Sequence, residues 1–187
     1  MNTEAFSFNH LGEQYGATTL GLLLVLLLLL ALWRRWRGQS MRVITVIDGD
    51  TLVAVTHRGK KLRLRLRGID CPELDQPLGP QARQAAGELV AKQWLRVRLH
   101  GKDRYDRYVA DVWTADGQAL QELLVRQGLA HVLPNSPWSW RRAQWGARLR
   151  RRGVHGWGHT APWEHRRKKS IFSKLWRAIS SRKPRRY

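Results

Sequence analysis

Residues 60–67 read KKLRLRLR, in which leucine alternates with a basic residue from position 61 onward. Only a β-strand places such residues on two opposite faces, because its side chains repeat every two residues. Two earlier segments, 42–47 and 51–57, are rich in β-branched residues. Turn residues separate the three segments, namely Asp48-Gly49-Asp50 and Arg58-Gly59. The pattern predicts a three-stranded meander.

The sequence after residue 67 alternates helical and strand patterns. Two further strands are predicted over 95–100 and 107–114. Helices are predicted over 78–93, 119–130 and 139–151, and the first of them opens with Gly79-Pro80, a favourable helix start. Five strands with interspersed helices predict a mainly β fold of the α+β class. We expect a small closed barrel with about three helices packed on it.

An uncharged and mostly leucine run occupies residues 14–33, after a short polar N-terminus at 1–13. A helix of this length spans roughly 30 Å, which is the thickness of the hydrocarbon core of a bilayer. Arginines follow the run in the linker 34–40, whereas no Lys or Arg precedes it. The run is therefore predicted to be a retained, single-pass transmembrane helix, with the C-terminal part of the chain in the cytoplasm.

The charge of the chain favours an anionic partner, either a nucleic-acid backbone or an acidic membrane surface. Its formal net charge is +20, and ten of the basic residues lie in the tail 166–187, which has no acidic residue. The globular domain is expected over 41–165. Apolar residues of the tail recur at helical spacing, so two interpretations stay open: a helix lying on anionic lipid, or a disordered solubilising tail.

Charged residues gather at the turns of the predicted barrel, and each group taken singly is typical of an ordinary turn or a solvated strand face. Their joint order, however, resembles the staphylococcal nuclease family, or thermonucleases. The resemblance runs from about residue 42 to 164 and rests on six motifs: VIDGDT (46–51), RLRGIDCPE (65–73), LGPQA (78–82), DRYDRYVADVW (103–113), LVRQGLA (124–130) and APWEHR (161–166).

The resemblance implies an OB-type barrel that hydrolyses phosphodiester bonds of DNA and RNA with calcium. Matched residue by residue, it makes Asp50 and Asp70 the side-chain ligands of Ca²⁺, and Cys71 a ligand through its backbone carbonyl. Asp48 and Thr51 would lie beside the metal. Carboxylate and carbonyl oxygens are the hard ligands that calcium prefers.

The same resemblance gives three residues catalytic roles. Glu73 would be the general base that deprotonates the attacking water. Arg65 and Arg107 would grip the scissile phosphate, since a guanidinium offers planar, bidentate donors and stays charged at any working pH. Together they would neutralise the charge that develops on the phosphate oxygens.

Neighbouring residues are the expected substrate contacts, namely Arg104, Tyr105, Arg63 and Arg67. The last two share a strand face with Arg65, so a place at the barrel surface without substrate contact is an equal alternative for them. Cys71 is not expected to be a nucleophile, because the sequence places no histidine beside it.

Two positions depart from the family pattern. Asp106 stands where the family usually has glycine, which predicts a left-handed backbone and a carboxylate next to Arg107. Pro134 and Ser136 stand where the staphylococcal enzyme has tyrosines that stack on the nucleotide. Binding would then rest on the nucleic-acid backbone and depend on salt.

The sequence therefore favours a membrane-tethered, calcium-dependent nuclease. One alternative is a catalytically weak or inactive module that binds DNA or RNA at the membrane. Another is a membrane-surface scaffold that uses the basic tail on anionic lipid. The sequence does not identify which protein partners the chain has.

Overall fold

The computed structural model describes residues 19–30, 38–156 and 159–180. The chain divides into two compact units, Met1–Gly38 and Gln39–Tyr187. In the first unit residues 19–30 are helical, and the leucine side chains there are exposed. The predicted anchor 14–33 continues beyond this segment at both ends, outside the described residues. Among the helices that are described, none has the length and apolar character needed to cross a membrane.

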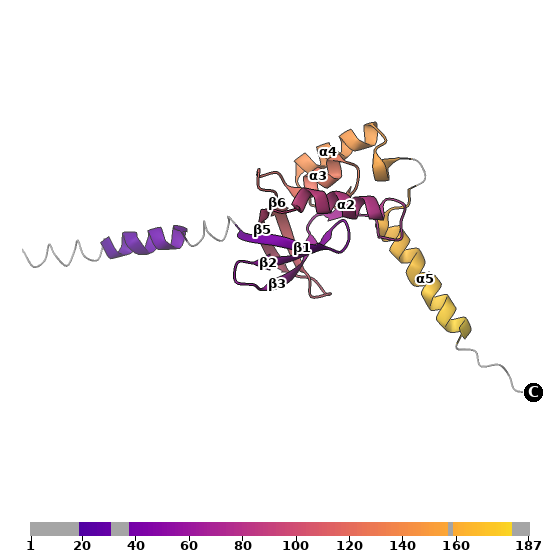
Figure 1. Cartoon of the computed structure of the whole chain (residues 1–187), viewed down its shortest axis with the longest axis horizontal. Helices are drawn as coiled ribbons and strands as arrows, with labels where there is room; N and C mark the ends of the chain where they lie inside the picture. The colour runs from indigo at the N-terminus through magenta and orange to yellow at the C-terminus, as the bar shows by residue number, and fades with distance from the viewer. Residues whose placement is uncertain (1–18, 31–37, 157–158, 181–187) are drawn as a thin grey trace, which may run out of the picture. The chain divides into compact units, whose positions relative to one another are not determined.

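The second unit contains the predicted five-stranded barrel, which is confirmed and is consistent with an OB-type fold. The strands close in the order β1-β2-β3-β6-β5 (Figure 1). Their bounds are β1 Gln39–Val46, β2 Thr51–Thr56, β3 Lys61–Leu66, β5 Trp94–Lys102 and β6 Tyr108–Trp113.

Strand pairing explains how the barrel closes. β1, β2 and β3 form the antiparallel meander that the sequence predicts. β3 then pairs with β6 in parallel, with Arg65 opposite Val109. A parallel pair needs a long crossover, and here the chain passes through helix α2 (Gly79–Val90) and β5 before it returns. β5 pairs antiparallel with both β6 and β1, which completes the ring.

The leucines of β3 are buried and its basic residues face outward, as their alternation predicts. Leu62, Leu64 and Leu66 are 7%, 0% and 1% exposed, whereas the basic residues between them face outward. Burying each leucine contributes about 2 kcal/mol to folding. The same core takes in apolar residues of the other strands and of the helices α2 and α3 (Leu120–Arg126).

In the described residues of this unit, four α-helices lie outside the barrel (Figure 1). α2 and α3 agree with the predicted helices, as does α4 (Trp138–Leu149), and each is shorter than expected. The fourth, α5 (Pro162–Ser180), begins before the boundary expected between 165 and 166. The part of the tail that the structure describes is therefore helical.

The structure adds a small sheet that the sequence did not indicate. β4 (Ile69–Asp70) pairs antiparallel with β7 (His131–Val132), and two residues a strand are too few to show a period. Gly68 precedes β4 with φ of +74°. The Ser136 hydroxyl donates to the Gly68 carbonyl at 2.8 Å, so the position of the family's tyrosine has a structural role here.

Gly68→Ala tests how tightly the residue before β4 packs against Ser136 and Trp140, and Gly59→Ala is its control. Both glycines have a positive φ, but an added Cβ at Gly68 would lie 2.7 Å from Ser136 Oγ and 2.9 Å from the Trp140 ring, whereas Gly59 has open space. Urea unfolding should show a loss of about 1 kcal/mol for Gly59→Ala and about 3 kcal/mol for Gly68→Ala. Equal losses would contradict the tight packing.

Candidate functional site

A cavity of about 430 Å³ lies beside the start of β2, the outer face of β3 and the loop between β5 and β6. All of the residues that line it, except one, are residues that the sequence singled out. They are Asp48, Asp50, Arg63, Arg65, Glu73, Arg104, Tyr105, Arg107 and Arg166. Of the other residues predicted for the site, Asp70 and Cys71 lie directly behind this lining, and Arg67 has different partners.

Arg65 joins the two predicted metal-binding carboxylates. Its Nη2 donates to Asp70 Oδ1 at 2.8 Å, and its Nη1 forms an ion pair with Asp50. Asp50 and Asp70 are 3% and 2% exposed. Buried carboxylates are costly unless cations and hydrogen bonds satisfy them, so this guanidinium stabilises both.

Hydrogen bonds from two segments hold the Asp50 carboxylate in place. The Cys71 backbone N–H donates to Asp50 Oδ2 at 2.8 Å, and the Thr51 hydroxyl donates to Oδ1 at 3.3 Å. The Asp50 N–H in turn donates to Asp48 Oδ1 at 3.0 Å. Asp50 thus links the turn before β2 to the loop after β4.

The Cys71 side chain has no access to the cavity. It is 3% exposed, and burial raises the pKa of its thiol far above the usual value. A thiol that stays protonated is a poor nucleophile. The expectation that Cys71 takes no nucleophilic part agrees with this geometry, while the role of its carbonyl stays a prediction.

Glu73 is positioned by the loop that leads into α2. Its backbone N–H donates to Gln76 Oε1 at 2.9 Å, and Gln76 is only 6% exposed. A Cβ on Gly79 would lie 1.9 Å from the Glu73 carbonyl oxygen, so only glycine allows this approach. The Glu73 side chain is 36% exposed and faces the cavity.

Arg166, on the first turns of α5, is the residue of this site that sequence reasoning missed. Its Nη1 donates to Glu73 Oε1 at 2.6 Å, and its Nη2 donates to Asp70 Oδ2 at 2.6 Å. The hydrogen bonds to Asp70 and to Glu73 raise the pKa of the guanidinium. Its place at the end of the APWEHR motif is a signal in the sequence, but the residue is also the first of the basic tail 166–187.

Further contacts hold the start of α5 against the 71–78 loop. Asp75 accepts a hydrogen bond from Lys169 Nζ at 2.8 Å, and its other oxygen lies 3.1 Å from His165 Nε2. The hydrogen bond from Lys169, followed by that of His165, lowers the pKa of Asp75. Gln76 Nε2 donates to the Thr160 carbonyl at 2.9 Å. Arg166 is thus one of several links between α5 and the site.

Arg107 enters the cavity from the loop just before β6, the strand that is parallel to β3. Asp103 fixes it by accepting from its backbone N–H at 3.0 Å and from its Nε at 2.9 Å. Arg107 Nη1 also donates to Thr51 Oγ1 at 3.3 Å. Parallel pairing of β3 and β6 therefore brings Arg65 and Arg107 to the same cavity.

Asp106 has the left-handed backbone that the sequence predicts, with φ of +59°. The expectation that its carboxylate lies against Arg107 is wrong. The carboxylate pairs with Lys102 and is 82% exposed, and Asp103 is the partner of Arg107 instead. Tyr105 beside it is 60% exposed and has the guanidiniums of Arg104 and Arg107 near its ring.

The sequence leaves substrate contact and a place at the barrel surface as equal alternatives for Arg63 and Arg67, and the structure places the two residues differently. Arg63 lines the cavity, whereas Arg67 Nε donates to Asp111 Oδ1 at 2.8 Å on another part of the barrel. Burial opposes ionisation of Asp111, but hydrogen bonds from Arg67, His100 and Arg98 outweigh it and lower the pKa of this carboxyl. Arg67 therefore belongs to a structural ion cluster.

The donor chemistry of the site fits a hard divalent cation. Asp50 and Asp70 offer carboxylate oxygens within reach of one guanidinium, and the Cys71 backbone adjoins both. In the residues that the structure describes, no three His, Cys, Asp or Glu side chains form a metal-binding group. Further ligands would thus come from backbone carbonyls, water or substrate.

Comparison with known proteins agrees with this geometry. Residues 63–154 match the family model described as staphylococcal nuclease homologue. The staphylococcal-like nuclease CAN1 of Arabidopsis thaliana is 34% identical over 155 residues, covering 75% of this chain and 48% of the relative.

Bacterial proteins are similar over a shorter stretch. An uncharacterized endonuclease of Haemophilus influenzae is 36% identical over 92 residues, which is 49% of this chain and 51% of the relative. A second uncharacterized endonuclease, from Escherichia coli, is 37% identical over 91 residues, which is 49% of this chain and 59% of the relative. The chain thus spans about half the length of these relatives. Together with the closed barrel, these matches show that residues 63–154 of the chain are similar to the staphylococcal nuclease family.

Proposed function

We propose that the domain is a nuclease that hydrolyses phosphodiester bonds of DNA or RNA in the 430 Å³ cavity. The observation that carries the proposal is the convergence of Arg65, Arg107 and Glu73 on one cavity, together with the buried carboxylate of Asp50 in its lining and that of Asp70 directly behind it. The names of the relatives in H. influenzae and A. thaliana, an endonuclease and a nuclease, support the same activity.

Each of these side chains has a distinct task in the proposed reaction. Arg107 would bind the non-bridging phosphate oxygens and stabilise the charge that grows there in the transition state. Arg65 would do the same from β3, and Arg63 and Arg104 would draw in the phosphates on either side. Glu73 would take a proton from the attacking water, for which its loop already holds it at the cavity wall.

We further propose calcium as the cofactor, held by Asp50, Asp70 and the Cys71 carbonyl. Bound there, calcium would polarise the phosphate and the attacking water. Arg65 and Arg166 now contact the carboxylate oxygens that the cation would need. Arg166 and the cation would therefore compete for Asp70, and Arg166 would keep its contact with Glu73 or turn toward substrate phosphate.

The membrane assignment also remains a proposal. The uncharged run 14–33 supports it, together with the arginines in the linker 34–40. On α5, Ile171, Phe172 and Trp176 are 56%, 70% and 62% exposed among basic side chains. An apolar group of this kind, bordered by cations, suits an anionic leaflet.

Glu73→Gln tests the general base in the full chain, purified in detergent. With calcium, the wild type should cut single-stranded DNA and RNA, and excess chelator should abolish cutting. The variant should be roughly 100-fold to 10,000-fold slower, because the amide cannot accept the water proton. Gel assays of labelled oligonucleotides measure both effects.

Glu88→Gln on the exposed side of α2 removes the same charge far from the cavity, and should leave the rate unchanged. If the folded wild type binds oligonucleotides but never cuts them, the domain is a binding module instead. If it cuts equally well in chelator, the calcium proposal fails.

Arg166→Gln tests the competition at Asp70. Removing the charged hydrogen bonds of Arg166 should tighten calcium binding several-fold. The gain should not exceed roughly ten-fold, because the arginine is partly exposed and its ion pairs are therefore weakened by solvent. Calorimetric titration of the full chain measures this without substrate. Arg167→Gln changes the charge equally at the next residue and should have a much smaller effect. Identical affinity in the wild type and both variants would contradict the competition.

Orientation in the membrane can be measured with a fusion after Tyr187. A reporter that is active only in the cytoplasm should work, because the arginines follow the apolar run. Replacing Arg34, Arg35 and Arg37 by glutamine should reduce its activity by weakening that bias. A silent reporter in the unaltered chain would place the domain on the other side.

A further inference from the structure

Helix α4 presents a face that the proposed active site does not use. Its inner side packs into the domain through Trp140, Gln144 and Ala147, which are 5%, 8% and 2% exposed. Its outer side carries Trp138, Trp145 and Leu149, which are 68%, 67% and 85% exposed. Large apolar side chains this exposed at helical spacing are a common mark of a binding surface.

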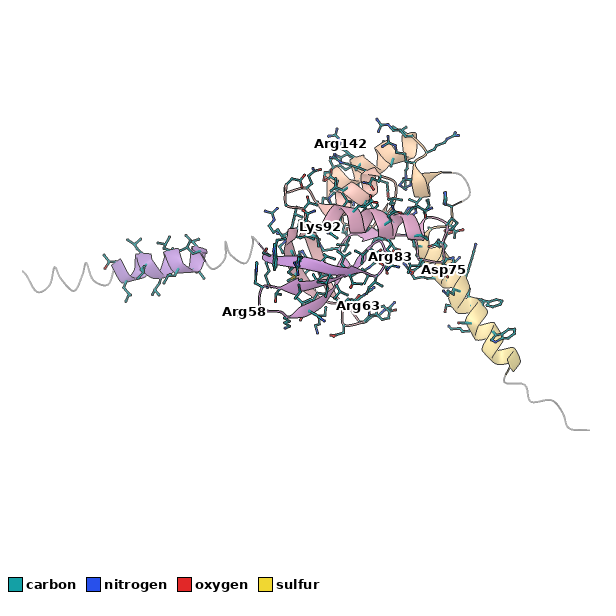
Figure 2. All side chains as sticks on the ribbon, in the orientation of Figure 1. Arg58, Arg63, Asp75, Arg83, Lys92 and Arg142 are labelled. Carbon is teal, nitrogen blue, oxygen red and sulfur yellow. The ribbon has the colours of Figure 1, made fainter. Side chains whose placement is uncertain are left out.

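Arginines lie between and beside these tryptophans. Arg141 and Arg142 occupy the turn between Trp138 and Trp145, and Arg148 follows on the same helix. Figure 2 shows the Arg142 side chain on α4, away from Arg63 at the cavity. We use the name α4 face for the exposed surface of this helix that is formed by Trp138, Arg141, Arg142, Trp145, Arg148 and Leu149.

The charges of this region are not neutralised within the domain. A groove of about 520 Å³ between α3 and α4 is lined by Arg126, Arg142, Arg150 and Arg152 and by one acid, Glu122. Glu122 pairs with Arg126 at 2.6 Å. Among the described residues the other three arginines have no ion-pair partner, unlike Arg65, Arg67 and Arg107 of the barrel.

This excess of cations favours an anionic partner, and the arrangement of the tryptophans indicates which kind. A helix that lies in a lipid surface turns a continuous apolar side toward the acyl chains. On the exposed side of α4 the large apolar side chains are Trp138, Trp145 and Leu149, and the two turns between the tryptophans carry Arg141 and Arg142 instead of a further exposed apolar residue. The exposed side interleaves indoles with guanidiniums over roughly 10 Å of helix.

That interleaving matches a single-stranded nucleic acid. Bases of a single strand can stack on exposed indoles, which the paired bases of a duplex cannot, and the arginines between them meet the phosphates. We propose that the α4 face and the adjoining groove form a second binding surface, for single-stranded DNA or RNA, separate from the cavity that holds Glu73. The two sites share no lining residue.

The test measures binding in excess chelator with the full chain in detergent, so that it does not depend on hydrolysis. The probes are labelled single strands of about 30 nucleotides, followed by fluorescence anisotropy. The double variant Trp138→Ala/Trp145→Ala should bind roughly ten-fold or more weakly. Arg141→Gln/Arg142→Gln should also bind more weakly, and its salt dependence should be lower by about 0.7 in slope for each phosphate that the removed charges would have neutralised.

Matched controls separate this surface from general effects. Trp176→Ala removes an exposed tryptophan from α5, and Arg58→Gln/Lys60→Gln removes two exposed charges from the turn between β2 and β3. Both should bind nearly as the wild type does. Because all substituted side chains are exposed, the melting temperatures should stay unchanged, which shows that each variant is folded.

Two results would overturn the proposal. One is unchanged affinity of the tryptophan variant for the single strands. The other is that the tryptophan variant loses binding to vesicles of anionic lipid while it still binds the oligonucleotides as the wild type does. That result would make α4 a lipid-binding helix. Neither result bears on the proposed nuclease, since cutting by the cavity is measured separately in calcium.

Discussion

The parallel pairing of β3 with β6 is the constraint on which the site depends. The other four pairs of neighbouring barrel strands are antiparallel, and this is the one parallel pair among them. It also brings Arg107 next to Arg65, although the two are far apart along the chain. A closed barrel has no free edge, so the register of β3 is fixed and the direction of each arginine follows from it.

The second constraint on the site is that its buried carboxylates must be paired with cations. Asp50 and Asp70 are almost fully buried, and such carboxylates must be paired with cations or coordinate a metal. In this structure Arg65 and Arg166 meet the requirement. The same oxygens are the ones on which the proposed calcium site would rely, so the start of α5 and that site are linked through one residue.

The arginines of the domain fall into two groups with different consequences. Several of those of the barrel are bound by acids: Arg65 by the buried aspartates, Arg67 by Asp111 and Arg107 by Asp103. They order the site and the barrel wall. Those of α4 lie among exposed tryptophans, where their charge remains available to a partner. The formal net charge of +20 therefore does not tell which arginines are paired with acids and which remain available to a partner.

Local patterns predicted much of this fold. The alternation of leucine and arginine identified β3 and its buried face, and Gly79-Pro80 marked the start of α2. The motifs that resemble the nuclease family singled out nearly every residue that lines the cavity. Other features depended on contacts that no local pattern carries. Asp106 has the backbone that the sequence predicts, yet its carboxylate turns to Lys102 because Asp103 already holds Arg107.

The sequence by itself thus determined the strands of the barrel, their buried faces and the kinds of side chain available for chemistry, because these rest on periods of two or 3.6 residues or on residue types that a turn requires. Only the tertiary structure decided the partner of each charge, including the contact of Arg166 with Asp70 and Glu73 from 96 and 93 residues away. The physical reason is that ion pairs form between whichever groups the closed fold brings within a few ångströms, and sequence separation does not limit that.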